Sequence, residues 1–293
     1  MLGEIRGEVR FKEPLSFHTS LRIGGPADIF VVPQDVDDIR LALSFAEREQ
    51  LPVQIIGGGN NLLVSDRGFH GVVLRLEGCL GRVDFHGEEA VAGAGVNLSA
   101  LIREAAALNL GGIECLVGIP ATIGGAVAMN AGTADGAIGD FVSAVYFLHP
   151  DGALGEFKPR AGSFSCRVFA PPPGAVLVGA RLGLHRRPHP EIQKEIKQRL
   201  KRKKASQPLA LASAGSVWKN PGGDAASRLI EKVGLRGKRL NGVEISAKDA
   251  NFIVNRGGAT CADIKALMDL TRDRVQHHFG ISLEPEIRTL GEI

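Results

Sequence analysis

Clusters of glycine constrain this fold more than any other feature of the sequence. The chain has 38 glycines among 293 residues, well above the background of about 7%. Glycine lacks a Cβ atom, so its backbone can approach a ligand closely. Three clusters stand out: RIGGPAD at 22–28, GGGNN at 57–61 and GIPATIGGAVAMNAG at 118–132. The sequence predicts that these clusters line a binding site.

The GGGNN cluster follows the apolar run 53–56, which is typical of a buried strand. It lacks the GxGxxG spacing of a Rossmann fold, and strand-like residues rather than a helix follow it. Bare N–H groups at such a position can surround a pyrophosphate. Taken alone, the cluster could be an ordinary glycine turn. Together, three clusters favour an extended dinucleotide, because one loop could hold only a phosphate.

Hydrophobic periodicity predicts alternating strands and helices in a first lobe that closes near residue 184, and a smaller lobe after a boundary at 186–190. Residues 111–139 have too much glycine for a helix or strand and too little charge for a linker. We therefore expect this stretch to pack under a ligand. The expected strands are 29–32, 53–56, 71–76, 90–94, 142–148, 175–184 and 251–255; the expected helices are 35–49, 98–108, 191–204, one begun by Asp224, and one begun by a capping box at Thr260 and Asp263.

Composition excludes several classes of protein. The net charge of +3 argues against a nucleic-acid scaffold. The charged, glycine-broken start MLGEIRGEVRF resembles neither a signal peptide nor a membrane span, so we expect a cytoplasmic protein. The cysteines show no metal-ligand spacing, which predicts free thiols and no metal: Cys79, Cys115, Cys166 and Cys261.

Six motifs occur in the order found in the UDP-N-acetylenolpyruvoylglucosamine reductase (MurB) family, which this chain resembles from about residue 18 to 288. They are HTSLRIGGPAD, GGGNNLLVSD, GIPATIGGAVAMNAG, AGSVWKNP, ANFIVN and LEPEIR. The resemblance implies an α+β fold with a PCMH or vanillyl-alcohol-oxidase (VAO) type FAD-binding domain of two α+β subdomains, then a smaller α+β substrate-binding domain. The implied boundaries are an N-terminal extension at 1–17, the FAD domain at 18–184 and the substrate domain at 190–293.

The resemblance also implies the activity. The family passes a hydride from NADPH through FAD to the enolpyruvyl ether of a UDP-sugar, which yields the peptidoglycan precursor UDP-N-acetylmuramate. Ser216 matches the family's proton donor, and Glu286 and Arg167 match the residues that stabilise the enol intermediate. Arg160 is the rival to Arg167. We expect non-covalent FAD, a UDP-sugar substrate, and neither a nucleic-acid, membrane nor obligate protein partner.

The motifs assign further residues to binding. Lys219 and Asn220 are expected to face the substrate, and Arg288 the flavin. The remaining expected cofactor contacts are Gly57, Gly58, Gly59, Asn60, Asn61, Leu62, Gly118, Ile119, Pro120, Gly124, Gly125, Asn130 and Gly132.

Two positions depart from the family pattern. Cys166 stands where tyrosine is usual, which leaves the polarity beside the flavin open, and Asp249 stands where histidine is usual. The sole tyrosine is Tyr146, so the chain resembles the type II subgroup, without the tyrosine loop that covers the substrate in the other subgroup. The basic run 201–204 could meet the UDP diphosphate or be a solvated helix C-terminus.

Two other functions are compatible with parts of the pattern. A different flavin oxidoreductase on the same FAD domain would commonly have a larger substrate domain, and many tether the flavin through histidine or cysteine. A nucleotide-sugar sensor would not need Ser216, Arg167 and Glu286.

Overall fold

A computed structural model describes residues 2–78, 80–165, 168–169 and 171–293. The chain forms two compact units, and each is discontinuous in sequence. Unit 1 comprises Met1–Phe11, Ile29–Gly58 and Gly71–Lys203, and unit 2 comprises Lys12–Asp28, Gly59–His70 and Lys204–Ile293. These units differ from the linear boundaries expected at 184 and 190. The assignment of FAD binding to 18–184 and substrate binding to 190–293 stays a prediction.

A four-stranded sheet with the order β1-β2-β5-β3 supplies the first core of unit 1. Its strands are β1 (Glu8–Pro14), β2 (Pro26–Val32), β3 (Val53–Ile56) and β5 (Phe69–Arg75), and β3 and β5 are parallel. Helix α1 (Val36–Arg48) packs Ile39, Ala42 and Ala46 against this sheet. Asp35 caps the helix by accepting hydrogen bonds from the N–H groups of Asp37 and Asp38.

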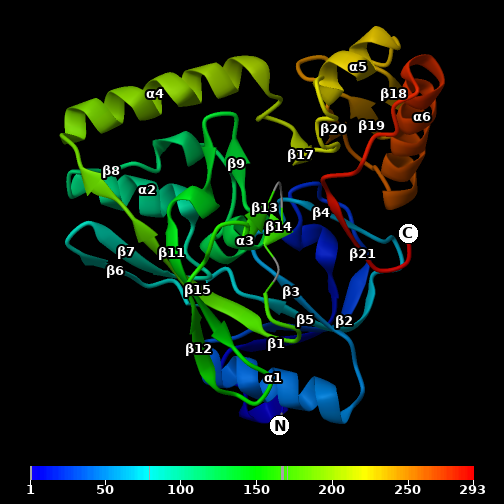
Figure 1. Cartoon of the computed structure of the whole chain (residues 1–293). Helices are drawn as coiled ribbons and strands as arrows, with labels where there is room; N and C mark the ends of the chain where they lie inside the picture. The colour runs from blue at the N-terminus through cyan, green and yellow to red at the C-terminus, as the bar shows by residue number, and fades with distance from the viewer. Residues whose placement is uncertain (1, 79, 166–167, 170) are drawn as a thin grey trace. The chain divides into compact units, whose positions relative to one another are not determined.

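A five-stranded sheet with the order β12-β11-β15-β7-β6 supplies the second core of unit 1. Helices α2 (Leu98–Ala107), α3 (Ile123–Ala128) and α4 (His189–Ser206) contribute buried side chains to this core, and Figure 1 shows α4 alongside α2 and β8. The two cores correspond to the two expected α+β subdomains. The strands are β6 (Val83–His86), β7 (Glu89–Gly93), β11 (Val142–Leu148), β12 (Leu154–Phe157) and β15 (Val176–Gly183).

Short elements complete unit 1. They are η1 (Leu2–Glu4), β8 (Leu110–Gly111), η3 (Glu114–Leu116), β9 (Gly132–Thr133), β10 (Gly136–Ala137), η4 (Ile138–Asp140), β13 (Phe164–Ser165), β14 (Val168–Phe169) and β16 (His185–Arg186).

The expectation that residues 111–139 contain no helix or strand is wrong, because this stretch includes α3 and the two short strands β9 and β10. Thr122 caps α3, with its Oγ1 accepting a hydrogen bond from Gly125 N–H at 3.2 Å. Ile123, Ala126 and Val127 are all fully buried. Burial of this apolar face offsets the cost of about 1 kcal/mol that each helical glycine carries relative to alanine.

Unit 2 is built on a four-stranded sheet with the order β17-β20-β19-β18 and on helices α5 and α6. The predicted capping box at Thr260 and Asp263 is confirmed, and α5 begins two residues after Asp224. The elements of unit 2 are η2 (Leu15–His18), β4 (Leu62–Val64), β17 (Ala212–Ser216), α5 (Ala226–Lys232), β18 (Arg239–Leu240), β19 (Val243–Ile245), β20 (Phe252–Asn255), α6 (Cys261–Phe279) and β21 (Arg288–Leu290).

Among the helices of the described residues, none combines the length and the apolar character needed to cross a bilayer.

A buried carboxylate holds the N-terminal segment of unit 1 to α1. Asp38 has no exposed surface and accepts hydrogen bonds from the N–H groups of Arg6, Gly7 and Gln34 at 3.0, 2.8 and 2.8 Å. Burial by itself raises the pKa of Asp38, but these bonds and the Arg6 guanidinium outweigh it, and the net pKa is below 3.8.

We predict that Asp38→Asn lowers the free energy of unfolding at pH 7 by about 1–3 kcal/mol, since an amide NH₂ cannot accept the N–H bonds. The lowered pKa of Asp38 means that its stabilisation is present above 3.8 and is lost as the pH falls through the folded-state pKa. Denaturant unfolding of both proteins at pH 7 and at a pH well below 3.8 measures this, and the difference between the two free energies of unfolding should narrow at the lower pH. A constant difference would contradict the prediction.

Candidate functional site

A bulge at the end of β17 positions Ser216. Ser213 pairs with Val254 and Ser216 with Phe252, so two residues on β17 face one on β20. Gly215 lies in the bulge with a φ of 79°, a left-handed conformation that a residue with a Cβ rarely adopts. Ser216 is half-buried at the end of this strand.

The C-terminal LEPEIR segment runs beside the residues that follow Ser216. Trp218 forms an antiparallel bridge with Pro285. The Glu286 N–H donates to the Val217 carbonyl at 2.7 Å, and the Lys219 N–H donates to the Glu284 carbonyl at 2.9 Å. The structure therefore brings Ser216 and Glu286 onto neighbouring segments of unit 2.

The GGGNN loop joins the same group through Asn61. The Asn61 side-chain amide donates to the Glu286 carbonyl at 3.1 Å, and the Asn61 carbonyl accepts from the Arg288 N–H at 3.0 Å. Beyond this point β21 pairs with β4 in parallel, with Arg288 opposite Leu62. Three segments expected to carry the chemistry thus meet in unit 2.

Burial alternates only in part along the LEPEIR segment. Leu283 and Ile287 are buried at 2% and 5% exposure, whereas Glu284 and Arg288 are exposed and Glu286 is half-buried. The buried pair belongs to the core of unit 2. Apolar anchoring therefore fixes the segment, which leaves the charged side chains at the surface of the unit.

Two glycines of the GGGNN loop are required by close packing. A Cβ at Gly57 would lie 2.4 Å from Thr122 Oγ1, and one at Gly59 would lie 1.9 Å from the His18 carbonyl oxygen. No described residue accepts a hydrogen bond from the backbone N–H groups of residues 57–60. These donors suit a pyrophosphate, whose oxygens only accept, so the loop fits the anionic part of a dinucleotide.

The second glycine cluster is arranged differently. The N–H groups of Ile123 and Gly124 donate to the carbonyls of Val96 and Ala94 at 2.8 and 2.9 Å, and that of Gly125 donates to Thr122. These N–H groups at the start of α3 therefore already have acceptors within unit 1. Any cofactor contact from Gly124 or Gly125 would use their lack of a side chain rather than their N–H groups.

Other expected contacts in unit 1 have definite places. The Asn130 side chain accepts from Gly139 N–H at 3.0 Å and donates to the Ser165 carbonyl at 2.9 Å. Gly118, with a φ of 74°, lies under the Leu200 and Lys203 side chains of α4. Ile119 and Gly132 are half-buried and Pro120 is exposed.

The two expected substrate residues differ in their local partners. Lys219 forms an ion pair with Glu284, with Nζ and Oε2 3.1 Å apart. The Asn220 carboxamide oxygen accepts the Ala226 N–H at 3.0 Å and so caps the start of α5. Arg167 and Cys166 lie outside the described residues, and the rival Arg160 is exposed.

Asn251 is the residue in this group to which sequence reasoning gave no role. It lies in the ANFIVN motif, is 6% exposed, and makes hydrogen bonds to both the N–H and the carbonyl of Trp218. A buried asparagine needs partners for its amide, but only the fold shows which residues supply them.

Comparison with known proteins agrees with this geometry. A family model described as UDP-N-acetylenolpyruvoylglucosamine reductase, C-terminal domain, matches residues 207–290, and an FAD binding domain model matches residues 27–158. A reductase of that name from Moorella thermoacetica is 43% identical over 97% of this chain and 94% of its own length. One from Anaeromyxobacter sp. is 45% identical over 98% of this chain and 90% of its own length.

This chain belongs to the UDP-N-acetylenolpyruvoylglucosamine reductase family. The crystal structure of the Thermus caldophilus reductase matches with a TM-score of 0.84 and 36% identity, over 98% of this chain and all of that one. A variant of the Physcomitrella patens protein BBE-like 1 matches 63% of this chain and 43% of its own with a TM-score of 0.50 and 18% identity, which shows the fold alone. The expected FAD-binding fold with a C-terminal α+β domain is confirmed.

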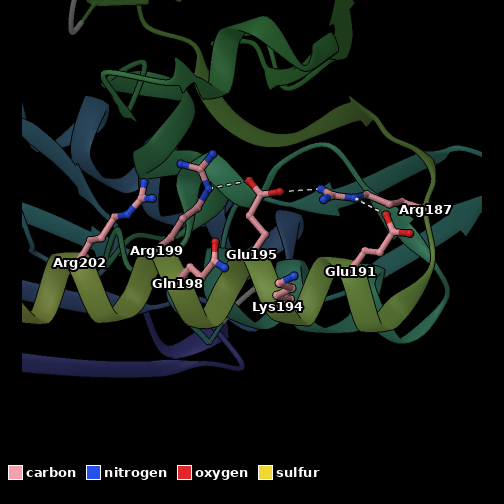
Figure 2. Close-up of a pocket in the computed structure, with 7 residues that line it drawn as sticks. All are labelled: Arg187, Glu191, Lys194, Glu195, Gln198, Arg199 and Arg202. Carbon is pink, nitrogen blue, oxygen red and sulfur yellow. Dashed lines mark hydrogen bonds and ion pairs between the residues drawn. The ribbon is translucent and has the colours of Figure 1, made fainter.

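A separate charged hollow lies along α4 and contains none of the reductase-family site residues assigned above. Its volume is about 450 Å³. Glu195 bridges Arg187 and Arg199, with both N–O distances 2.7 Å, and Figure 2 shows the three side chains meeting end to end. Hydrogen bonding from Arg187, then from Arg199, lowers the pKa of Glu195 despite burial. The lining residues are Arg187, Glu191, Lys194, Glu195, Gln198, Arg199 and Arg202.

The basic run 201–204 ends this helix, and Lys201 and Lys204 are exposed. In unit 2 the Lys248 ammonium donates to the Lys204 carbonyl at 2.8 Å, which places a cation at the C-terminus of α4, as the helix dipole favours. Contact of this run with a UDP diphosphate stays a prediction. Among the described residues, no three His, Cys, Asp or Glu side chains gather where they could hold a metal ion.

Asp249, at the position where the family usually has histidine, is a carboxyl group whose charged form the fold disfavours. Burial raises its pKa, and the opposing effects of the Asn251 N–H bond at 3.0 Å and of Arg236 do not cancel this. A raised folded-state pKa means that the folded protein binds the proton more tightly than the unfolded chain. Stability therefore falls as the pH rises above 3.8 through the folded-state pKa.

We predict that Asp249→Asn raises the melting temperature at pH 7, because the amide oxygen can still accept the Asn251 N–H while the charge is removed. Thermal unfolding of both proteins at pH 7 and near pH 4 checks this. The gain should shrink toward pH 4, where the native carboxyl takes up its proton. A variant that is less stable at pH 7 would contradict the assignment.

Proposed function

We propose that this chain catalyses the NADPH-dependent reduction of UDP-N-acetylenolpyruvoylglucosamine to UDP-N-acetylmuramate, with non-covalently bound FAD, in peptidoglycan precursor synthesis. Family membership over nearly the whole chain supports the reaction. The observation that carries it is the meeting of Ser216, Glu286 and Asn61 on hydrogen-bonded segments of unit 2. We place the reaction in the cytoplasm, because both its sugar substrate and its reductant are soluble nucleotides.

FAD supplies the hydride chemistry when bound, since it can accept a hydride from NADPH and deliver it to the vinyl carbon of the substrate. The N–H groups of residues 57–60 would hold its pyrophosphate, and Arg288 would lie near the flavin. The other proposed contacts are Leu62, Gly118, Ile119, Pro120, Gly124, Gly125, Asn130 and Gly132. The open N–H groups support the first of these assignments most directly.

Proton delivery is assigned to Ser216. Hydride addition to the vinyl carbon distal to the carboxylate leaves negative charge on the α-carbon and its carboxylate. A serine hydroxyl is a weak acid, so it can protonate that carbon only when it is held against a strongly basic centre with few competing waters. The half-buried position at the end of β17 supports this role.

Stabilisation of the enol intermediate is assigned to Arg167 and Glu286. A guanidinium can bind the developing enolate carboxylate with two parallel hydrogen bonds. Glu286 is held by its own backbone bonds to Val217 and Asn61, which limits its freedom. Lys219 and Asn220 would bind the UDP-sugar.

We predict that Ser216→Ala leaves the rate of flavin reduction by NADPH unchanged but slows flavin reoxidation by the enolpyruvyl substrate about 10²-fold or more, the scale for loss of a positioned acid. Anaerobic stopped-flow absorbance measures the two half-reactions separately. Ser213→Ala, on the same strand, is the matched control and should leave both rates intact. An unchanged reoxidation rate in the Ser216 variant would remove it from the mechanism.

We predict that Gly57→Ala lowers the bound flavin content, because its Cβ would collide with Thr122 Oγ1 and displace the loop. Gly81→Ala is the control, since its Cβ would meet no atom within 4 Å and its φ is not positive. Absorbance near 450 nm relative to protein measures the bound flavin. Flavin should leave the denatured chain on filtration, and retention would indicate a covalent tether and a different oxidoreductase. Equal flavin content in both variants would contradict the loop assignment.

A further inference from the structure

Asn251 makes hydrogen bonds to Val217–Trp218, the dipeptide that directly follows Ser216. Its carboxamide oxygen accepts the Trp218 N–H at 2.9 Å, and its amide donates to the Trp218 carbonyl at 2.8 Å. Its backbone carbonyl accepts the Val217 N–H at 2.8 Å. One buried residue thus makes three hydrogen bonds to residues 217 and 218.

The gripped dipeptide is bonded on its other side to the Glu286 segment. The Val217 carbonyl accepts the Glu286 N–H at 2.7 Å, and Trp218 bridges Pro285. Ser216 directly precedes Val217, and the bulge at Gly215 leaves that end of β17 without a regular ladder. The path of the chain at Ser216 therefore depends on the bonds made just after it.

Hydrogen bonds within the preceding turn hold Asn251 in place. Its N–H donates to the Asp249 carboxylate at 3.0 Å, and Ser246 Oγ accepts the N–H groups of Lys248 and Asp249 at 3.1 and 3.4 Å. These bonds order the turn that leads into β20. Asn251 therefore has a fixed position at the start of β20. We infer that it orders the bulged end of β17, rather than the reverse.

We propose that Asn251 is a positioning residue that sets Ser216 and Glu286 in register for the substrate half of the reaction. The inference rests on the proposed function. Asn251 acts through the Val217–Trp218 backbone, to which it makes the three hydrogen bonds described above. Loss of its carboxamide would leave the Trp218 N–H and carbonyl buried without their partners, so this backbone would shift.

The test compares Asn251→Ala with Val243→Ala in the holoenzyme. Val243 is buried at 1% exposure on β19, which β20 separates from β17 in the sheet, so its truncation provides a destabilised control on a strand that does not pair with β17. We expect Asn251→Ala to keep its flavin and its rate of reduction by NADPH. Its reoxidation by the enolpyruvyl substrate should slow by about 10–10²-fold, the cost of a displacement of about 1 Å.

A second readout follows the backbone directly. Trp218 is the only tryptophan of the chain and is 1% exposed. Its emission should shift to longer wavelength, or become accessible to iodide, in Asn251→Ala but not in Val243→Ala. Asn251→Asp keeps an oxygen that can accept the Trp218 N–H, and its protonated form also has an O–H group that can donate to the Trp218 carbonyl. At a pH low enough to protonate this carboxyl group, the reoxidation rate of Asn251→Asp should therefore exceed that of Asn251→Ala.

The outcomes separate the two proposals. If the native enzyme itself fails to reoxidise with the enolpyruvyl substrate, the proposed function fails. If the native enzyme reacts and Asn251→Ala reoxidises at the native rate, or slows only as much as Val243→Ala, the positioning role is overturned. If Asn251→Ala does not fold, Asn251→Asp is compared with Val243→Ala in the same two readouts, and equal rates in these two variants overturn it.

Discussion

The hydrogen bonds of Asn61 to the C-terminal segment are the contact on which the arrangement of the assigned site depends. Asn61 follows the glycine loop, yet it bonds to the backbone of Glu286 and Arg288 near the other end of the chain. Parallel pairing of β4 with β21 continues the same contact. Without it, the loop to which we assign pyrophosphate binding and the segment of Glu286 would be unconnected.

Glycine serves two distinct purposes in the two loops. At positions 57 and 59 its small size lets the chain pass within contact of Thr122 and His18, and no described residue accepts a hydrogen bond from the N–H groups of residues 57–60. At Gly124 and Gly125 it allows a helix start to press against its neighbours, and the N–H groups are consumed there. Similar composition therefore has different chemical consequences, because the deciding variable is which acceptors lie nearby.

The carboxylates of Asp38 and Asp249 show the same dependence on partners. Asp38 receives three backbone N–H bonds and stays ionised easily, whereas Asp249 receives one and is disfavoured as an anion. Asp249 nevertheless supports Asn251, and Asn251 supports the chain beside Ser216. Asp249, which stands where the family usually has histidine, is thus connected through Asn251 to the chain beside Ser216.

By itself, the sequence determined the elements that depend on local signals. Periodic apolar residues predicted α1, β3 and β11, and Thr260 with Asp263 predicted the start of α6, because capping and amphipathic burial act within a few residues. Ordered motifs also identified the family. Only the tertiary structure decided that α3 forms in a glycine-rich stretch, and that residues 59–70 join the C-terminal unit and hence that Asn61 reaches Glu286. These outcomes depend on burial and strand pairing between segments far apart in the chain. A local sequence pattern does not specify which distant segment a loop or strand will contact.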